Sequence, residues 1–61
     1  MRYEKLFALL EARGIPKTRL TDDGIISKET LRRLVHDEPV SLRTLERLCT
    51  LLGCRIYEIA E

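Results

Sequence analysis

The sequence predicts an all-α fold of five short helices. Apolar residues recur every three or four positions along almost the whole chain, and no segment alternates apolar and polar residues as a strand would. Glycine and proline residues interrupt this pattern at several points. Two segments begin with a serine directly after a β-branched apolar residue, which is typical of helix N-termini. Together these observations indicate one small helical domain over residues 1–61.

The first predicted helix covers residues 3–12, and its large apolar side chains share one face: Tyr3, Leu6, Phe7 and Leu10. Gly14 suits the left-handed conformation at which many helices end. Pro16 then fits the first turn of a second helix over residues 16–22, because the missing proline N–H costs nothing there. Gly24 supplies the sharp turn that follows.

The third helix is predicted over about residues 27–36 and opens on a serine cap. Ile26 precedes Ser27, and Leu31 stands at the fourth helical position, which is the spacing of a hydrophobic staple. Three apolar residues would form its buried stripe: Leu31, Leu34 and Val35.

The fourth helix repeats this beginning with Val40, Ser41 and Leu45, and it should stop at Gly53. Five residues form its predicted buried stripe: Leu42, Leu45, Leu48, Cys49 and Leu52. A last short helix over residues 55–60 completes the five.

The charge balance is uneven along the chain. The formal net charge of +1 is weak evidence for a polyanionic partner. Residues 1–19 nevertheless carry five basic side chains against two acidic ones, whereas residues 48–61 carry one basic side chain against two acidic ones. A polyanion is therefore not expected at the C-terminal end.

No catalytic or metal-binding constellation is evident. Cys49 and Cys54 lack partners at metal-ligand spacing, and His36 is the only histidine. We expect both cysteines to be ordinary apolar residues, with a redox or metal role as the alternative. A single histidine without a partnered nucleophile makes no triad, so we expect no enzyme, no cofactor and no small-molecule ligand. Without an apolar run of membrane-spanning length, we expect a soluble cytoplasmic protein.

The outer face of the third helix carries charged and polar side chains: Lys28, Glu29, Arg32, Arg33 and His36. Arginine and lysine match the O6/N7 edge of guanine, and glutamate can accept from cytosine N4. A helix supported from behind by a core, with such side chains in front, suits a DNA major groove. The alternative is a solvent-exposed helix stabilised by i,i+4 Glu–Arg pairs. The preceding turn and the second capped helix favour base contacts.

Three predicted helices carry a cation in the first turn: Lys17, Lys28 and Arg43. The helix dipole disfavours a cation there by about 0.3–1 kcal/mol per exposed site. A bound phosphate would reverse this, because the free N–H groups and the cation would then face the same anion. The alternative is that these long side chains extend into solvent. Three such positions in one small domain favour phosphate contact.

A longer pattern is carried by four stretches: Leu10-x-x-x-Gly14-Ile15, Gly24-Ile25-Ile26-Ser27-x-x-Thr30-Leu31-x-x-Leu34, Val40-Ser41-Leu42-x-Thr44-Leu45-x-x-Leu48-Cys49 and Leu52-Gly53-Cys54-x-Ile56-x-x-Ile59. Together they resemble the Cro and phage-repressor type of helix-turn-helix domain, which has the lambda-repressor-like fold. The resemblance covers essentially the whole chain and is closest to small stand-alone members.

The resemblance implies a double-stranded DNA partner and assigns residues to it. Base contacts are expected from Lys28, Glu29, Arg32 and Arg33. Phosphate contacts are expected from Lys17, Thr18, Ser27, His36, Ser41 and Arg43. Three places depart from the usual family pattern. Gly24 stands one position early, Pro16 replaces a hydroxyl cap, and Asp37 and Glu38 replace a glycine-containing turn.

We therefore expect a sequence-specific transcriptional regulator, with repression as its mode of action. The alternative is a helical protein-interaction module, antitoxin-like or adaptor-like, without sequence-specific DNA binding.

A homodimer is also expected, because the core is small and one reading helix covers only a few base pairs. Its predicted interface residues are apolar and lie near the C-terminal end: Leu51, Ile56, Tyr57 and Ile59. The alternative is that these residues only close the core of the monomer.

Overall fold

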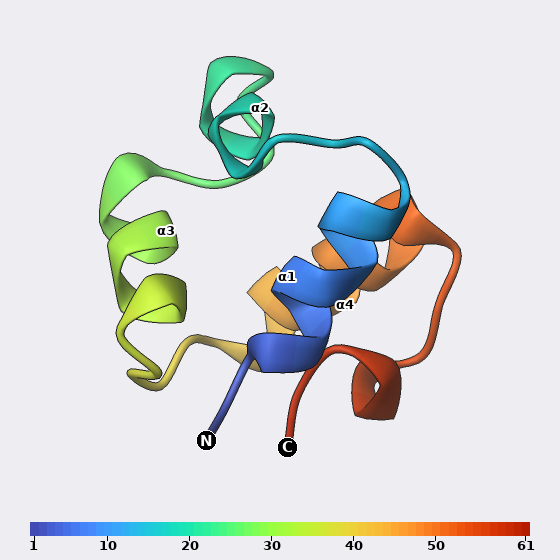
Figure 1. Ribbon diagram of the computed structural model, residues 1–61. Coiled ribbons are helices and arrows are strands. Elements are labelled where there is room, and N and C mark those ends of the chain that lie inside the picture. The colour runs from blue at the N-terminus through green and yellow to red at the C-terminus, as the bar shows by residue number, and fades with distance from the viewer.

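The computed structural model describes all 61 residues and contains helices, turns and loops but no strand. Its elements are α1 (Glu4–Ala12), α2 (Lys17–Asp22), α3 (Lys28–Val35), α4 (Leu42–Leu52) and a 3-10 helix, η1 (Ile56–Glu58). In Figure 1, α1 and α4 form the centre, α2 and α3 lie on one side of them, and η1 lies near the chain ends. The all-α prediction is confirmed.

The predicted fifth helix is shorter than expected and is η1 rather than an α-helix. Its backbone bonds include Glu58 N–H to Arg55 O at 2.9 Å and Ile59 N–H to Ile56 O at 3.0 Å, which are i→i+3 bonds. The Glu58 carboxylate also accepts from the Arg55 N–H at 2.7 Å, which closes this single turn from its beginning.

The core is formed by ten buried residues, all of them apolar or aromatic. They come from every part of the chain: Tyr3, Leu6, Leu10, Leu20, Ile26, Leu34, Leu45, Leu48, Leu52 and Ile59. Helix α4 contributes three of them, whereas α3 contributes only Leu34. Helix α3 therefore touches the core along a narrow strip, and most of its surface stays free.

Two residues of the predicted buried stripes are exposed. Val35 is 43% exposed and Leu42 is 61% exposed. Val35 is the last residue of α3 and Leu42 is the first residue of α4, so each stands where its helix meets a solvent-exposed connection. The periodic pattern was therefore wrong at the two helix ends that flank the α3–α4 loop.

Both predicted serine caps are confirmed. The Ser27 hydroxyl accepts from the Thr30 N–H at 3.1 Å, and the Ser41 hydroxyl accepts from the Thr44 N–H at 3.2 Å. In each pair the two hydroxyl groups also hydrogen-bond to each other, at 2.9 Å and 3.0 Å. These bonds fix the first turns of α3 and α4.

Pro16 lies one position outside its predicted place. It is the N-cap of α2, with φ −67° and an extended ψ of 141°, and α2 begins at Lys17. The Pro16 carbonyl accepts from the Arg19 N–H at 3.0 Å and so starts the helix. The proline ring fixes φ but not ψ, and the extended ψ keeps the residue out of the helix. Helix α1 likewise begins at Glu4, with Tyr3 as its cap.

The two chain ends lie side by side (Figure 1). Arg2 and Glu61 exchange two backbone hydrogen bonds, each of 2.9 Å, as paired strand residues do. The Lys5 ammonium adds an ion pair with the Glu61 side chain at 3.3 Å. No helix in this structure combines the length and the apolar character that a bilayer span demands.

Candidate nucleic-acid interface

Helices α2 and α3 are joined by a turn that fixes their relative orientation. Gly24 has φ +72°, a conformation that side chains with a Cβ atom rarely adopt. Directly after it, the N–H groups of Ile25 and Ile26 both donate to the Leu20 carbonyl, at 2.9 Å and 3.1 Å. Leu20 and Ile26 are buried, so the turn is also anchored in the core. This unit holds α3 rigidly at the edge of the molecule.

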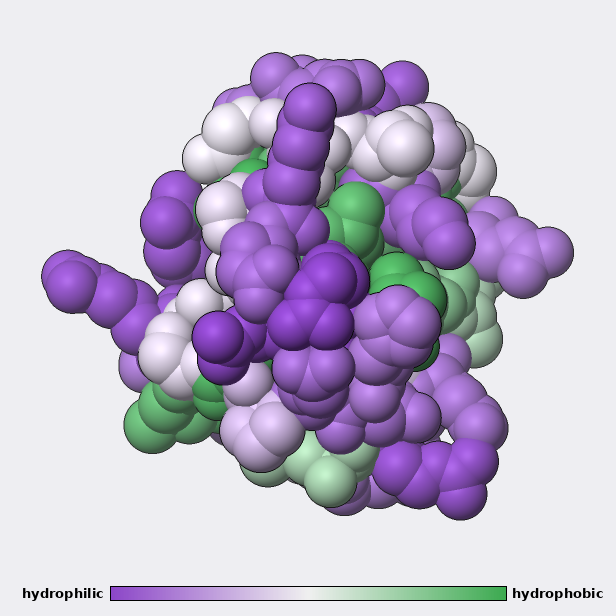
Figure 2. Space-filling view, turned by 90° about the vertical axis from the view of Figure 1, so that its left-hand side faces the viewer, coloured by the Kyte–Doolittle hydropathy of each residue, from purple (hydrophilic) through white to green (hydrophobic).

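The outer face of α3 is exposed and hydrophilic. Figure 2 views the molecule from the side of α3 and shows hydrophilic side chains across the middle of this face, with apolar patches beside them. All four predicted base-contacting residues are exposed: Lys28, Glu29, Arg32 and Arg33. They lie within the first six residues of α3, on the side opposite the buried Leu34.

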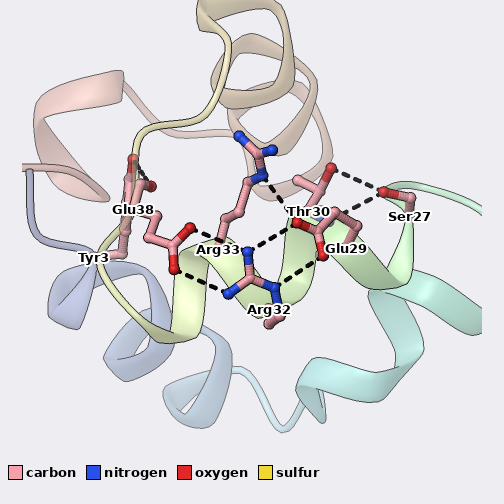
Figure 3. Close-up of polar contacts among 7 residues, drawn as sticks. All are labelled: Tyr3, Ser27, Glu29, Thr30, Arg32, Arg33 and Glu38. Atoms are coloured by element: carbon pink, nitrogen blue, oxygen red, sulfur yellow. Dashed lines mark hydrogen bonds and ion pairs between the residues drawn. The ribbon is translucent and has the colours of Figure 1, made fainter.

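Three of these four residues are tied together by ion pairs (Figure 3). Arg32 donates from Nε and Nη2 to the two Glu29 carboxylate oxygens, both at 2.9 Å. The Arg33 Nε also donates to Glu29, at 3.3 Å. These i,i+3 and i,i+4 pairs are the exposed Glu–Arg network that the sequence offered as the alternative interpretation. Lys28 stands outside the network and has no ion-pair partner.

The network includes one residue that the sequence pattern did not indicate, Glu38. Arg32 Nη1 and Nη2 donate to the two Glu38 carboxylate oxygens at 2.9 Å and 3.1 Å. Glu38 lies six residues after Arg32, beyond the end of α3, so helical periodicity gives no signal for the pair. The only clue in the sequence was the acidic pair Asp37-Glu38 at a turn where glycine is usual.

The ion pairs shift the pKa values of Glu29, Glu38 and Arg32. Hydrogen bonds from Arg32 and then Arg33 lower the pKa of Glu29 to about 2. The hydrogen bond from Arg32 likewise lowers the pKa of Glu38, and the two carboxylates raise the pKa of Arg32. All three groups are thus charged at neutral pH, and the outer face of α3 is a balanced array of opposite charges.

The six predicted phosphate-contacting residues are exposed but do not form one group: Lys17, Thr18, Ser27, His36, Ser41 and Arg43. Five of them stand at the N-termini of helices α2, α3 and α4. The exception is His36, which is the C-cap of α3 and lies at the opposite end of that helix from Ser27. The first-turn cations Lys17, Lys28 and Arg43 form no ion pair, so they remain available to an anion.

A shallow groove brings two predicted base contacts, Glu29 and Arg33, next to the predicted phosphate contact Ser41. It has a volume of about 270 Å³ and lies between α3 and the start of α4. Six residues line it: Glu29, Thr30, Arg33, Val40, Ser41 and Thr44. The N-terminus of α4 therefore opens beside the reading face of α3, close to Arg33.

The predicted dimer residues divide into exposed and buried ones. Tyr57 is 70% exposed and Leu51 is 46% exposed, while Ile56 is half-buried. Ile59 is 0% exposed and belongs to the core, so its prediction as an interface residue is wrong. Its side chain closes the monomer, because the chain after η1 turns back towards α1.

Comparisons with known proteins agree with this geometry. The sequence profile of the Cro/C1-type helix-turn-helix DNA-binding domain matches residues 5–61. The crystal structure of the transcriptional regulator VanUg is similar to the whole chain, with a TM-score of 0.91 and 37% sequence identity. The similarity covers 98% of this chain and 80% of that one. A search of curated proteins found no match. The resemblance indicated by the sequence motifs is thus confirmed.

Proposed function

The chain belongs to the Cro/C1-type helix-turn-helix family and is a DNA-binding transcriptional regulator, and on this basis we propose that α3 reads base edges in the major groove. This family is a class of DNA-binding domains rather than of enzymes. The observation that carries the proposal is the position of α3. Only Leu34 of this helix is fully buried, and its charged face is open to solvent. A helix held in this way can enter the groove without disturbing the core.

Lys28 is the strongest candidate for a base contact. It stands in the first turn of α3, where recognition helices of this type approach the bases, and it has no intramolecular partner to give up. Glu29, Arg32 and Arg33 are also at the surface, but each must first exchange an ion-pair partner for a base. For these three residues, each base contact would replace an ion pair within the protein, whereas the contact of Lys28 would replace none.

Phosphate contacts are proposed at the starts of α2 and α4, which flank the reading helix. Lys17 and Thr18 open α2, while Ser41 and Arg43 open α4. Free N–H groups and a cation at one helix end suit an anion, as does the hydroxyl of Thr18. Ser27 and His36 lie at the two ends of α3 and would contact the phosphates of the DNA backbone there.

We also propose that the working form is a symmetric homodimer that acts as a repressor in the cytoplasm. Two reading helices spaced by about 34–36 Å would enter successive major grooves. The exposed apolar side chains of Leu51 and Tyr57 and the half-buried Ile56 would supply the contact. A dimer bound over a promoter would exclude other proteins from the same DNA by occupying it.

The first experiment selects binding sequences from a random duplex pool and measures variants on the selected operator. Lys28→Ala should weaken operator binding by about 1–3 kcal/mol and relax preference at one base position. Lys5→Ala is the matched control, because Lys5 lies on α1 and pairs with Glu61. Equal affinity of the Lys28→Ala variant and the wild type would contradict the assignment of the reading helix.

Arg43→Ala tests the phosphate assignment in the same assay. It should weaken all duplexes to a similar degree and make the slope of log affinity against log salt shallower by about 0.9. A change of sequence preference would instead move Arg43 among the base-contacting residues. If the wild type bound no duplex at low salt, the protein-interaction alternative would replace the whole proposal.

The dimer is tested by sedimentation of wild type and Tyr57→Glu, each with and without operator. The charge should separate the subunits and reduce operator affinity, because a buried unpaired carboxylate is costly. A wild-type protein that binds as one copy to a non-palindromic site would contradict the dimer.

A further inference from the structure

We propose that Glu38 is a specificity-determining residue that restrains Arg32 and so weakens complexes with the wrong DNA sequence. This inference rests on the proposed role of α3 as the reading helix. Glu38 would act through Arg32 and is therefore a positioning residue, distinct from the side chains that touch bases.

The first support is the saturation of the Arg32 guanidinium. Glu29 takes Nε and Nη2, and Glu38 takes Nη1 and Nη2, so all three nitrogens donate to carboxylates. The two forks approach the guanidinium from different edges (Figure 3). Without release of at least one carboxylate, Arg32 has no free edge to offer bidentately to a guanine or a phosphate.

The second support is the fixed position of Glu38. Its N–H donates to the Arg33 carbonyl at 2.8 Å, and its carbonyl accepts from the buried Tyr3 hydroxyl at 3.1 Å. The preceding Asp37 accepts from the Tyr3 N–H at 3.1 Å. The backbone of Glu38 is thus anchored to both α3 and the start of α1. Its carboxylate is presented to Arg32 from a rigid turn, in contrast to a long side chain on an open helix surface.

The third support is the charge balance of this face. Glu29 and Glu38 carry two negative charges, and Arg32 and Arg33 carry two positive ones, so the network is neutral as a unit. Phosphate oxygens can only accept hydrogen bonds, and they repel carboxylates. The major-groove edge of a G·C pair, by contrast, offers both: guanine O6 and N7 can accept from Arg32, and cytosine N4 can donate to a carboxylate. Only a matching sequence can therefore satisfy both signs of charge.

It follows that the carboxylate of Glu38 disfavours phosphate contacts by Arg32 more than it disfavours base contacts. Removing it would free a cation for any duplex, whatever its sequence. The protein would then bind random DNA more tightly while gaining less on its operator, and the ratio of the two affinities would fall.

The experiment compares wild type, Glu38→Gln and the control Glu61→Gln on the selected operator and on a random duplex, between 50 and 200 mM salt. Glu61 also pairs with an exposed cation, Lys5, so its substitution removes the same charge from an ion pair on another element. Glu38→Gln should bind random duplex about three- to tenfold more tightly, with a salt slope steeper by about 0.9. Glu61→Gln should change neither the slope nor the affinity ratio.

A double-mutant cycle identifies the cation that is released. In an Arg32→Ala background, Glu38→Gln should leave the salt slope on random duplex almost unchanged, because no guanidinium remains to be freed. The melting temperature of Glu38→Gln serves as a further readout and should stay near that of wild type, since exposed ion pairs contribute little to stability.

Three results would overturn the proposal. They are an unchanged affinity ratio in Glu38→Gln, an equal change in Glu61→Gln, and an equal change in the Arg32→Ala background. The last two would assign the effect to net charge alone. A wild type that bound operator and random duplex equally would have a different meaning, because it would overturn the proposed function together with this inference.

Discussion

Helices α3 and α4 begin in the same way but serve different purposes. Each opens on a serine that caps the N–H of a threonine three residues later, and each has a leucine at the next position. Beyond the first turn they diverge. Helix α4 buries three leucines and runs through the centre of the molecule, whereas α3 buries only one and lies at the edge. The same start signal can therefore introduce either a core helix or a helix displayed for binding.

The ends of the two helices differ in chemistry while sharing a backbone conformation. The residue at the end of α4 is Gly53, with φ +63°, and the equivalent turn after α3 contains Asp37, with φ +56°. Asp37 is the one residue other than glycine with a positive φ. Its carboxylate accepts from the Tyr3 N–H, so the strained conformation is accompanied by a link to α1.

Helix α1 connects to the ends of both helices. At its start, the N–H of the cap residue Tyr3 donates to the Asp37 side chain, which follows α3. At its C-terminus, Arg13 donates from Nη1 to the Leu52 carbonyl at the end of α4. An acidic side chain thus accepts from one N–H at the start of α1, and a basic side chain donates to a carbonyl at the end of α4. Helix α1 therefore supports the end of α3 through Asp37, in addition to the turn that joins α3 to α2.

The largest expected difference between the two helices is in core packing. Leu48→Ala in α4 should reduce the free energy of unfolding by about 2–5 kcal/mol, because it leaves a cavity among buried leucines. Val35→Ala in α3 should cost less than about 1 kcal/mol, since Val35 is 43% exposed and lies outside the buried core. Urea denaturation of both variants measures the contrast. If the two variants lost similar free energies of unfolding, the packing of Val35 would contribute more than its exposure indicates.

The helix ends should give the next largest effect. Gly53→Ala should destabilise the protein by about 1–2 kcal/mol, because a Cβ atom strains the left-handed conformation. Asp37→Ala should cost about 1–2 kcal/mol by a different route, the loss of the charged acceptor for the Tyr3 N–H. Asp37→Asn keeps an oxygen acceptor and is the control. If Asp37→Asn destabilised the protein as much as Asp37→Ala, the contribution of Asp37 would depend on its charge.

The serine caps should be equivalent. Ser27→Ala and Ser41→Ala should each lower the free energy of unfolding by about 1 kcal/mol, since each removes the acceptor for one N–H of the first turn. Glycine at either position should cost only about 0.3 kcal/mol, as measured by thermal or chemical denaturation. Unequal alanine effects would mean that the two first turns are supported differently by their surroundings.

The smallest expected effect is the pH dependence of the Glu29 ion pairs on α3. The pKa of Glu29 is about 2 in the folded protein, below its ordinary value of 4.5, so folding favours the ionised form. The stabilising contribution of Glu29 is complete above about pH 4.5 and is lost as the pH falls towards about 2. Carbon-detected NMR of the Glu29 carboxyl should show this low midpoint, and Arg32→Ala should raise it. An ordinary midpoint in the wild type would contradict the ion-pair network.

Local signals were enough to predict much of the fold from the sequence. The caps at Ser27 and Ser41 and the stop at Gly53 depend on residues a few positions apart, so they can be recognised without the tertiary structure. Val35 and Leu42 were misassigned because periodicity says nothing about where a helix leaves the core. Pro16 was misplaced by one residue because proline fixes φ and leaves ψ to the surrounding chain.

The candidate site was less predictable, because its important contacts cross a turn. The exposure of Lys28, Glu29, Arg32 and Arg33 followed from the helical pattern. The pairing of Arg32 with Glu38 did not, because it depends on the left-handed turn at Asp37 that brings the chain back beside α3. The burial of Ile59 depends on the same kind of long-range folding, since the segment after η1 returns to Arg2.

The paired backbones of Arg2 and Glu61 make the chain almost a closed ring. A short glycine-rich linker between these positions would join the ends at little entropic cost, because they are already held together. New ends could then be opened at Gly14, in the exposed connection between α1 and α2. Such a circularly permuted protein would retain every contact of α3, and its ends would emerge beside the start of the reading unit, where a fused domain could be brought close to the DNA.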